Sequence, residues 1–592
     1  MAKPATKPKA AIKTKVTKKT ARPVKLAAIE KQEEVKEEIT SPFNWMFDAW
    51  NYQVDSWQRS VLFLDTLRQR ADNMIEHEKN GMPPLLDFKY EMVLDARTFE
   101  TPANYALLKI TEIENVCIQD CLDPEKPPVI IVDPRAGHGP GIGGFKRDSE
   151  VGIALHEGYP VYFVIFYPDP EPHQTIADVL HALRKFVEKA KALHGGKAPI
   201  LYGNCQAGWM LTILAADCQG LAGPIVMNGS PLSYWASGEE RSPMQINGSL
   251  AGGVWVARLM SDLGNGTLDG AWLVQNFEKL NPANALWEKY YNLYAHIDTE
   301  RDRFLEFERW WTGYHSFSEE EITATAQNLF IGNKLERGEL QLDDGCTIDL
   351  KAITNPLLIF ASHGDNITPP RQALHWIRHV YPTTDELKAA GQRIAYLINP
   401  NVGHLGIFVS AKVAKLEHRA ILEHVREMEE LKPGLYEMKI SNPTGDPDCS
   451  HDQYEVIFEE RRIEDLCEST SDKPLQAVRR VSERNDQLYR QMMQPWVQAF
   501  SNPISAEMLR VLHPMRLSKV VFSERINPWM WHTAWLAKMV EDHRAEKKHG
   551  GMLLEAEHNV SEHITKALHD ISDMRDESSA AMFKQLFKTN TV

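Results

Sequence analysis

The sequence predicts an α/β protein built on a mainly parallel sheet that is covered by helices. Between about residues 90 and 410, short apolar runs alternate with stretches of helical periodicity, which is typical of strands joined by helical crossovers. Each run is flanked by turn residues and lacks polar alternation, as expected for strands buried on both faces. The predicted strands cover residues 129–132, 161–165, 200–202, 224–227, 357–361 and 394–398.

The length, charge and cysteine content of the chain limit the kinds of protein it can be. The chain has 592 residues, 43% of them hydrophobic, enough for one large domain with extensions or for two to four smaller ones. A net charge of −15 argues against wholesale nucleic-acid binding, and seven cysteines without a CxxC pair indicate free thiols in a reducing compartment. No apolar run approaches the roughly 18 residues of a membrane span, and no signal-peptide core follows Met1. We therefore expect a cytoplasmic protein without a transmembrane segment.

Residues 1–40 are predicted to form a disordered tail and linker. Residues 1–25 carry eight lysines and Arg22 but no acidic residue. Such a segment cannot bury enough apolar surface to order itself. It is typical either of a solubilising tail or of a tether to a polyanion, such as nucleic acid or polyphosphate.

Residues 41–85 are predicted to contain an amphipathic helix. Trp50, Val54, Trp57, Val61 and Leu64 follow one another at spacings of four and three residues, which places them on one helical face. We expect this face to pack on the main domain or on a second copy of the chain. Adsorption to a hydrophobic surface is the alternative.

The main domain is expected to span residues 86–430. Within it, residues 230–350 are too long for a simple crossover and are most simply a helical cap or lid over the carboxyl ends of the strands. Residues 431–592 are predicted to be a mainly helical accessory or assembly domain. A hairpin formed by residues 435–440 and 454–458 would precede its helices.

A cysteine occupies a tight strand–helix corner. Gly203, Cys205 and Ala207 match the nucleophile elbow G-x-S-x-G, with cysteine for serine and alanine for the second glycine. Unpaired N–H groups and the helix dipole at such a corner favour a thiolate. The alternative is an inert, packed thiol.

Two further residues complete a pattern of catalytic side chains. Asp365 follows the strand at 357–361, and His404 follows the strand at 394–398. Nucleophile, acid and histidine, each after a strand, is the chain order of the triad in the α/β-hydrolase fold. We therefore expect Cys205 as nucleophile, His404 as base and Asp365 as its acid, within an α/β-hydrolase fold that carries a helical cap.

Backbone N–H groups are predicted to form an oxyanion hole. Gln206, directly after the nucleophile, would supply one donor. The loop after the strand at 129–132 would supply the other, with Arg135 and Ala136 as candidates.

The same loop matches GxGxxG at Gly139, Gly141 and Gly144, but Pro140 interrupts it and no acid stands about 20 residues on, so a dinucleotide site is disfavoured. The motifs indicate no cofactor and no metal. Four other residues of catalytic type lack a supporting motif and are interpreted as structural: Ser230, Ser362, His375 and His379.

The choice of cysteine favours transfer over hydrolysis. Moving an acyl group from a coenzyme A thioester to a thiol is nearly isoenergetic, so the acyl-enzyme stays activated. A weak alcohol nucleophile can then accept the acyl group, provided that water is excluded.

Residues 85–415 resemble poly(3-hydroxyalkanoate) synthases, α/β-hydrolase-fold enzymes whose lipase-like box holds cysteine. The stretches that carry the resemblance are PPVIIVDP, EGYPVYFVIFYPDPE, NGS, NKLERGELQLDDGCTIDL and GHLGIF. The resemblance implies that Cys205 is acylated by a 3-hydroxyacyl-CoA with release of CoA, that His404 is its base, and that Asp365 activates the incoming hydroxyl. It also implies a bacterial cytoplasmic protein, association with a polymer granule surface, and a homodimer.

The chain departs from the synthase pattern at two positions and in its length. Asn366 stands where synthases usually have histidine, and Pro370 where they have tryptophan, while residues 430–592 have no counterpart. Three hypotheses follow: a synthase-like acyltransferase, a thioesterase or esterase with the same triad, and a non-catalytic protein that binds granules or polyanions. A reaction with a 3-hydroxyacyl-CoA would distinguish them. The acyltransferase would give an oligomer, the thioesterase or esterase would give the free acid, and the non-catalytic protein would release no CoA.

Overall fold

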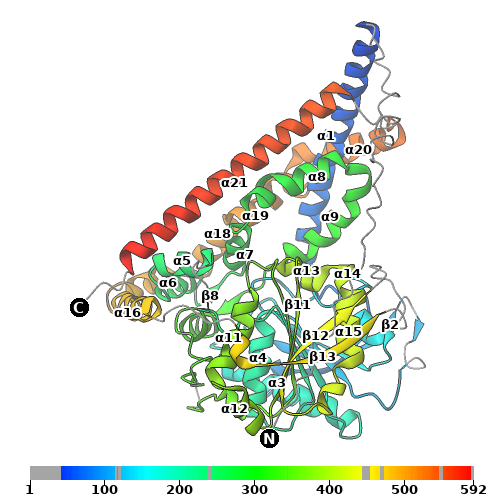
Figure 1. Cartoon of the computed structure of the whole chain (residues 1–592). Helices are drawn as coiled ribbons and strands as arrows, with labels where there is room; N and C mark the ends of the chain where they lie inside the picture. The colour runs from blue at the N-terminus through cyan, green and yellow to red at the C-terminus, as the bar shows by residue number, and fades with distance from the viewer. Residues whose placement is uncertain are drawn as a thin grey trace, which may run out of the picture.

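One large sheet with parallel central strands forms the base of the molecule (Figure 1). A computed structural model describes residues 42–113, 116–117, 122–236, 242–342, 345–442, 454–466, 473–545 and 551–587. The strand order is β1-β2-β5-β4-β6-β7-β10-β11-β12-β13, with β3 paired to β2. The strands are β1 (Lys89–Asp95), β2 (Tyr105–Ile113), β3 (Val116–Cys117), β4 (Val129–Val132), β5 (Val161–Phe166), β6 (Ile200–Asn204), β7 (Ile225–Asn228), β10 (Leu357–Ser362), β11 (Arg393–Asn399), β12 (Gly434–Ser441) and β13 (Glu455–Arg461).

All six predicted strands are confirmed, as β4, β5, β6, β7, β10 and β11, with ends that differ from the prediction by two residues at most. Their pairing is parallel, with Val132 opposite Gly203 and Asn204 opposite Asn228. The carboxyl ends of these strands therefore meet at one edge of the sheet, where the loops that carry the predicted catalytic residues begin.

Helices cover both faces of the sheet, and each face has its own hydrophobic core. One core contains Phe186, Trp209 and Trp376 from three helices, and the other contains Phe163 of β5 and Ile421. The helices of the body are α2 (Glu150–His156), α3 (Ile176–Leu193), α4 (Gln206–Asp217), α11 (Pro370–Val380), α12 (Thr384–Ala389), α13 (His404–Val409), α14 (Ala411–Val413) and α15 (Arg419–His424).

The interval between β7 and β10 forms a helical cap beyond the carboxyl edge of the sheet (Figure 1). It contains α5 (Pro243–Leu250), α6 (Trp255–Leu263), β8 (Thr267–Leu268), α7 (Ala271–Glu278), α8 (Lys289–Ala295), α9 (Ile297–Trp311), β9 (Phe317–Ser318) and α10 (Glu319–Thr325). The C-terminal helices pack on this cap: α16 (Lys473–Leu488), α17 (Gln494–Phe500), α18 (Pro503–Val511), α19 (Pro514–Phe522), α20 (Trp531–Asp542) and α21 (Met552–Leu586).

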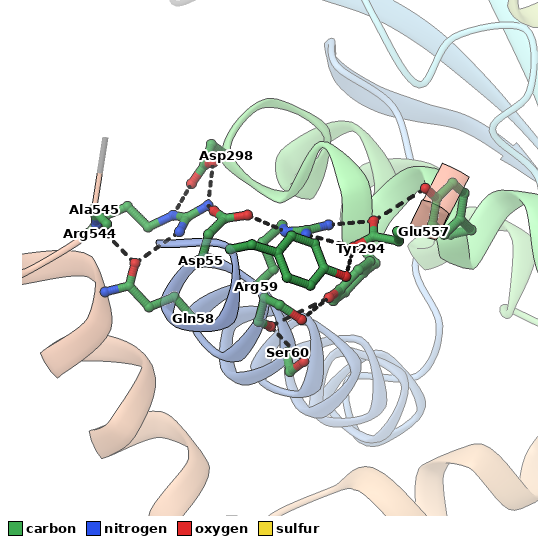
Figure 2. Close-up of polar contacts among 12 residues, drawn as sticks. Asp55, Gln58, Arg59, Ser60, Tyr294, Asp298, Arg544, Ala545 and Glu557 are labelled. Carbon is green, nitrogen blue, oxygen red and sulfur yellow. Dashed lines mark hydrogen bonds and ion pairs between the residues drawn. The ribbon is translucent and has the colours of Figure 1, made fainter. Parts of the chain in front are cut away.

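A long helix, α1 (Pro42–Lys79), joins the cap to the C-terminal helices. Figure 2 shows the polar contacts that fix it. Arg59 of α1 is buried and forms ion pairs with Asp55 and with Glu557 of α21, each at 2.8 Å. Arg544, after α20, pairs with Asp55 and with Asp298 of α9. Segments distant in the sequence are thus held together by charge-assisted hydrogen bonds.

The predicted apolar face of α1 is only partly covered within this chain. Trp50 and Trp57 are more than half exposed, and of the predicted stripe only Val61 is buried. Val61 and Leu62 pack against α8, α9 and α20, whereas the first turns of α1 project beyond the neighbouring helices (Figure 1). A periodic apolar face therefore exists, but no described neighbour covers its N-terminal part.

The predicted hairpin is confirmed as β12 and β13, and β12 also pairs in parallel with β11. The sheet thus continues to residue 461, and the helical region follows it. The predicted tail at residues 1–40 lies outside the described residues. Among the helices described, none combines the length and apolar character required to cross a membrane.

Candidate active site

Cys205 lies at the turn from β6 into α4, with backbone angles φ 47° and ψ −114°. A non-glycine residue with positive φ is strained, and such strain is typical of a nucleophile held at a sharp elbow. The N–H of Cys205 donates to the carbonyl of Asn228 at 2.8 Å, which ties the elbow to β7. The thiol is partly exposed.

Two glycines allow the close packing around this elbow. A Cβ on Gly203 would lie 2.9 Å from the backbone of Gly208, and one on Gly208 would lie 1.9 Å from the Ser230 hydroxyl. Ala207, in contrast, is accommodated as part of the buried core. The second essential glycine of the elbow is therefore Gly208, one position later than the motif places it.

The structure brings the predicted histidine and acid together. His404 is the first residue of α13, and its Nδ1 lies 2.7 Å from Asp365 Oδ2. The other oxygen of Asp365 accepts the N–H groups of Ile367 and Thr368, both at 2.8 Å. These three contacts fix the orientation of the Asp365 carboxylate. Asp365 therefore holds the His404 ring in one direction and leaves its second nitrogen, Nε2, available to another partner.

His404 also hydrogen-bonds Cys205, which completes the triad geometry. Burial disfavours the charged imidazolium, but the Asp365 carboxylate and the Cys205 side chain outweigh it and raise the pKa of His404 to about 10. The three residues can therefore activate a nucleophile.

The position of Asp365 bears on the role that the resemblance implies for it. Its side chain is fully enclosed behind His404 and does not line the cavity next to Cys205. A substrate hydroxyl in that cavity could reach the carboxylate only through His404. The geometry therefore fits Asp365 as the positioning residue of His404 rather than as a direct activator of a hydroxyl.

One of the three predicted oxyanion donors is already occupied. The N–H of Arg135 donates to the side-chain Oε1 of Gln206 at 2.9 Å, which removes Arg135 from the predicted pair. The N–H groups of Ala136 and Gln206 have no acceptor among the described residues. Ala136 and Cys205 line the same cavity, so these two N–H groups are the remaining candidates.

The side chain of Arg135 is structural. It is buried and forms an ion pair with Glu321 of α10 at 3.0 Å. It also donates to Asn104 Oδ1 and to the Ser316 carbonyl. The oxyanion loop is therefore anchored to the cap through this arginine.

Backbone hydrogen bonds fix the same loop to the cap at a second point. Gly139 N–H donates to the Gly313 carbonyl at 2.8 Å, and His315 N–H donates to the Gly137 carbonyl at 3.0 Å. Gly137 has φ +102°, and a Cβ there would lie 2.5 Å from the Gly270 carbonyl oxygen, so only glycine fits. The cap and the catalytic loop form one packed unit.

A cavity of about 300 Å³ opens at Cys205 and His404. Its wall is mainly apolar, as acyl-binding pockets are, and both the cap and the body of the protein contribute to it. The apolar and aromatic residues that line it include Ile142, Phe277, Leu280, Phe307, Trp310, Trp311, Leu405 and Phe408. The sequence predicted the cap but assigned none of these residues to a binding cavity.

Two charged side chains, those of Lys289 and Glu278, line the cavity and belong to a cluster of four. Lys289 lies 3.2 Å from Glu278 and 3.4 Å from Glu308, and Arg70 of α1 lies 2.6 Å from Glu308. Trp311 Nε1 also donates to Glu278. Because two cations face two anions, this cluster is balanced and presents no free charge to a substrate.

A buried carboxyl lies behind the elbow. Glu150 of α2 accepts a hydrogen bond from Asn204, which immediately precedes Cys205, and Asn228 donates to the same asparagine at 2.9 Å. Burial, followed by the Coulombic effect of Asp133, raises the pKa of Glu150 well above its ordinary value, although the Asn204 hydrogen bond opposes this. This shift of the pKa favours the neutral form of the Glu150 carboxyl behind the corner.

The residues set aside as structural have structural contacts. Ser230 packs under Gly208, Ser362 donates to the Val402 carbonyl at 2.6 Å, and His375 contacts Glu336 at 2.6 Å. The GxGxxG loop wraps around Asp133, whose carboxylate accepts the N–H groups of Gly141 and Gly143. Within the described ranges, no cluster of three His, Cys, Asp or Glu side chains has the arrangement of a metal site.

The strand order, the elbow after β6, the acid after β10 and the histidine after β11 define the α/β-hydrolase fold. The chain belongs to the family described as "Protein of unknown function (DUF3141)", whose model matches residues 55–592. A relative from Rhizobium meliloti, described as "Uncharacterized protein in ackA 5'region", is 43% identical over 552 residues. That match covers 91% of this chain and 74% of the relative.

Two solved structures illustrate the similarity to known folds. An acylaminoacyl peptidase of Pyrococcus horikoshii is 15% identical, with 58% of this chain and 42% of that chain covered and a TM-score of 0.28. A thermophilic esterase from Thermogutta terrifontis is 11% identical, with 57% and 99% covered and a TM-score of 0.34. The chain thus spans less than half of the peptidase, and at these identities the likeness concerns the fold alone.

Proposed function

We propose that the protein is an acyltransferase of the poly(3-hydroxyalkanoate) synthase type. It would form an acyl-cysteine at Cys205 from a 3-hydroxyacyl-CoA and pass the acyl group to a hydroxyl acceptor. The observation that carries the proposal is the contact chain from Cys205 through His404 to Asp365, placed at the mouth of an apolar cavity. The sequence resemblance supplies the substrate class.

The acylation step uses the groups already described. The sulfur of Cys205 attacks the thioester carbonyl carbon, and the N–H groups of Ala136 and Gln206 would bind the oxyanion. The bond between carbon and the CoA sulfur then breaks. His404 Nε2 gives its proton to the departing thiolate, while Nδ1 stays bonded to Asp365.

Transfer reverses these roles. His404, now neutral, takes the proton of an incoming alcohol, whose oxygen attacks the acyl carbon and breaks its bond to Cys205. The aromatic wall of the cap disfavours water, which supports transfer over hydrolysis. A hydrolase with the same triad is the second candidate, because water is the simplest hydroxyl acceptor and the thiol ester is open to it.

Intact-protein mass spectrometry after mixing with 3-hydroxybutyryl-CoA tests the proposal. We expect a single acyl adduct on the wild type and none on Cys205→Ala. Cys218→Ala is the matched control, since Cys218 is another partly exposed free thiol and its loss should leave the adduct unchanged. Product analysis then separates the candidates: oligomeric esters support transfer, free 3-hydroxybutyrate supports hydrolysis, and an unmodified Cys205 refutes both.

A polyanion contact remains a separate proposal for residues 1–25, supported by their charge alone. Polyphosphate or DNA binding that weakens with salt and disappears on deletion of these residues would support it. Retention of binding after the deletion would refute it. The deletion should leave acylation of Cys205 unchanged in either case.

A further inference from the structure

His138 is a cavity-lining residue that the triad does not use. It lies two positions after Ala136 in the loop that follows β4. Its backbone forms an isolated antiparallel β-bridge with Tyr314 of the cap. Its ring centroid lies 4.6 Å from that of Trp310 and 4.4 Å from that of Trp311. These two aromatic contacts and the hydrogen bond to the Trp311 carbonyl restrict the orientation of the imidazole.

The hydrogen bonds of His138 determine its tautomer. Nδ1 lies 3.1 Å from the Trp311 carbonyl oxygen, and because a carbonyl only accepts, the proton is on Nδ1. Burial lowers the pKa of His138 to about 3, so the ring stays neutral at physiological pH. Nε2 therefore carries a lone pair and can act only as an acceptor.

The Nε2 atom of His138 has no hydrogen-bond partner among the described residues, yet it is accessible from the cavity. His315 also has an unpaired Nε2, but that atom is fully buried. The Nε2 of His138 is not fully buried, and His138 lines the cavity. The cavity wall is mainly apolar, its polar residues include Asn281, Asn284 and Asn366, and its charged residues Lys289 and Glu278 are paired with each other. A ligand without a donor would bury this lone pair at a cost, and a ligand with a donor would satisfy it.

We propose that His138 is a specificity-determining residue, whose Nε2 accepts a hydrogen bond from a hydroxyl group on the bound acyl chain. This inference rests on the proposed acylation of Cys205. Because His138, Ala136 and Cys205 line the same cavity, we expect the recognised hydroxyl on the part of the acyl chain that this cavity holds. The site would then discriminate hydroxyacyl thioesters from unsubstituted ones, as buried polar groups do when left unpaired.

Substrate analogues test this on the wild-type protein. Single-turnover acylation of Cys205 is measured with 3-hydroxybutyryl-, 3-methoxybutyryl- and butyryl-CoA by quenched mass spectrometry. We expect the hydroxy compound to react roughly tenfold faster or more than both others, because the methoxy group has an oxygen but no proton to donate. Equal rates for the hydroxy and methoxy compounds would overturn the proposal.

Variants provide the second arm. His138→Leu should bring the hydroxy-to-unsubstituted rate ratio close to one, and His138→Gln, which keeps an acceptor, should restore part of it. Trp310→Phe alters the packing around the ring without removing the acceptor, so it should change rates but not the ratio. An unchanged ratio in His138→Leu would refute the role of His138 while leaving the acyltransferase proposal intact. Absence of any adduct with every thioester would instead refute the proposed function.

Discussion

The side chain of Gln206 accepts a hydrogen bond from the backbone N–H of Arg135, with 2.9 Å between Oε1 and N. The two residues belong to the two segments that must face each other for an oxyanion hole to form. Gln206 thus contributes its backbone N–H as a candidate donor and uses its side chain to hold the opposite loop at a fixed separation. Its amide is a positioning group for Ala136, the neighbour of Arg135.

Gln206→Ala should slow acylation without abolishing it. The variant keeps the backbone N–H of residue 206 but loses the tether to Arg135, so the Ala136 N–H is less well placed. We expect a loss on the order of ten- to a hundredfold in the acylation rate constant, the size of effect that small misplacements produce. Quenched-flow mass spectrometry measures the rate, and a rate equal to that of the wild type would contradict the tether.

Asp365→Asn should make the reactivity of Cys205 depend on pH. The raised pKa of His404 keeps the imidazolium protonated up to about pH 10, so alkylation of Cys205 by iodoacetamide should vary little between pH 6 and 9. Without the carboxylate the pKa of His404 falls, and the alkylation rate of the variant should change across this window. Burial, followed by Asp217, raises the pKa of Cys218 to about 12, so this thiol serves as a slow internal reference. A flat profile in the variant would contradict the assignment.

Glu150→Gln should stabilise the protein increasingly as the pH rises. The pKa of Glu150 is raised in the folded state, so above the ordinary carboxyl pKa the unfolded chain loses a proton that the folded chain keeps. The free energy of unfolding of the wild type therefore falls as the pH rises, and a glutamine escapes this loss. Urea unfolding at pH 5, 6.5 and 8 measures the difference. Glu427→Gln, at an exposed position, is the control, and a difference that is constant with pH would exclude the mechanism.

Arg135→Met should destabilise the fold strongly. The variant leaves Glu321 buried without its cation, which typically costs about 3–5 kcal/mol of unfolding free energy. Adding Glu321→Gln should recover much of the loss, because Gln174 already contacts that carboxyl at 3.1 Å. Arg184→Met breaks an exposed pair with Glu188 and should cost about 0–1 kcal/mol. Equal losses for the two arginines would refute the prediction.

The C-terminal helices expose an unusual amount of aromatic surface, and we expect a dimer of this chain to cover it. Five residues share this exposure: Trp496, Phe500, Trp529, Trp531 and Trp535, with Trp529 86% exposed. Three of them, Trp529, Trp531 and Trp535, are close together in the sequence around the start of α20, and covering one such side chain removes about 150–250 Å² from water.

Light scattering after size exclusion should give twice the mass of one chain. The double variant Trp496→Glu/Trp529→Glu should be monomeric, and Trp50→Glu, on the projecting end of α1, should remain dimeric. A monomeric wild type would contradict the expectation.

The fold was predictable because buried parallel strands leave a simple record in the sequence. Each of the six strands is a continuous apolar run followed by turn residues, and the triad could be located because its members follow those runs in a known order. How much of the α1 face is covered within the chain could not be predicted, for the opposite reason. Trp50 and Val61 have the same periodic position, but only the second meets helices that arrive from residues 289–311 and 531–542.

The details of the site depend on contacts that no local pattern records. One such contact is the hydrogen bond from the Arg135 N–H to the Gln206 side chain. Another is the close packing of Ser230 on residue 208, which requires glycine there rather than at 207. His138 gave no signal beyond its place in a glycine-rich loop. Its acceptor role emerges only when Trp311, more than 170 positions away, fixes the tautomer.

The backbone hydrogen bonds of Gly137 and Gly139 with residues 313–315 have a consequence for how this protein can change over time. An inserted segment that merely shielded a catalytic centre could be shortened, exchanged or lost while the chemistry survived. Here the insertion holds the backbone that would stabilise the reaction's charge, so a foreign cap would disturb catalysis before it altered selectivity. New substrates should therefore be reached by replacing side chains inside the existing cap, and transplanting the cap between relatives should succeed only together with its loop.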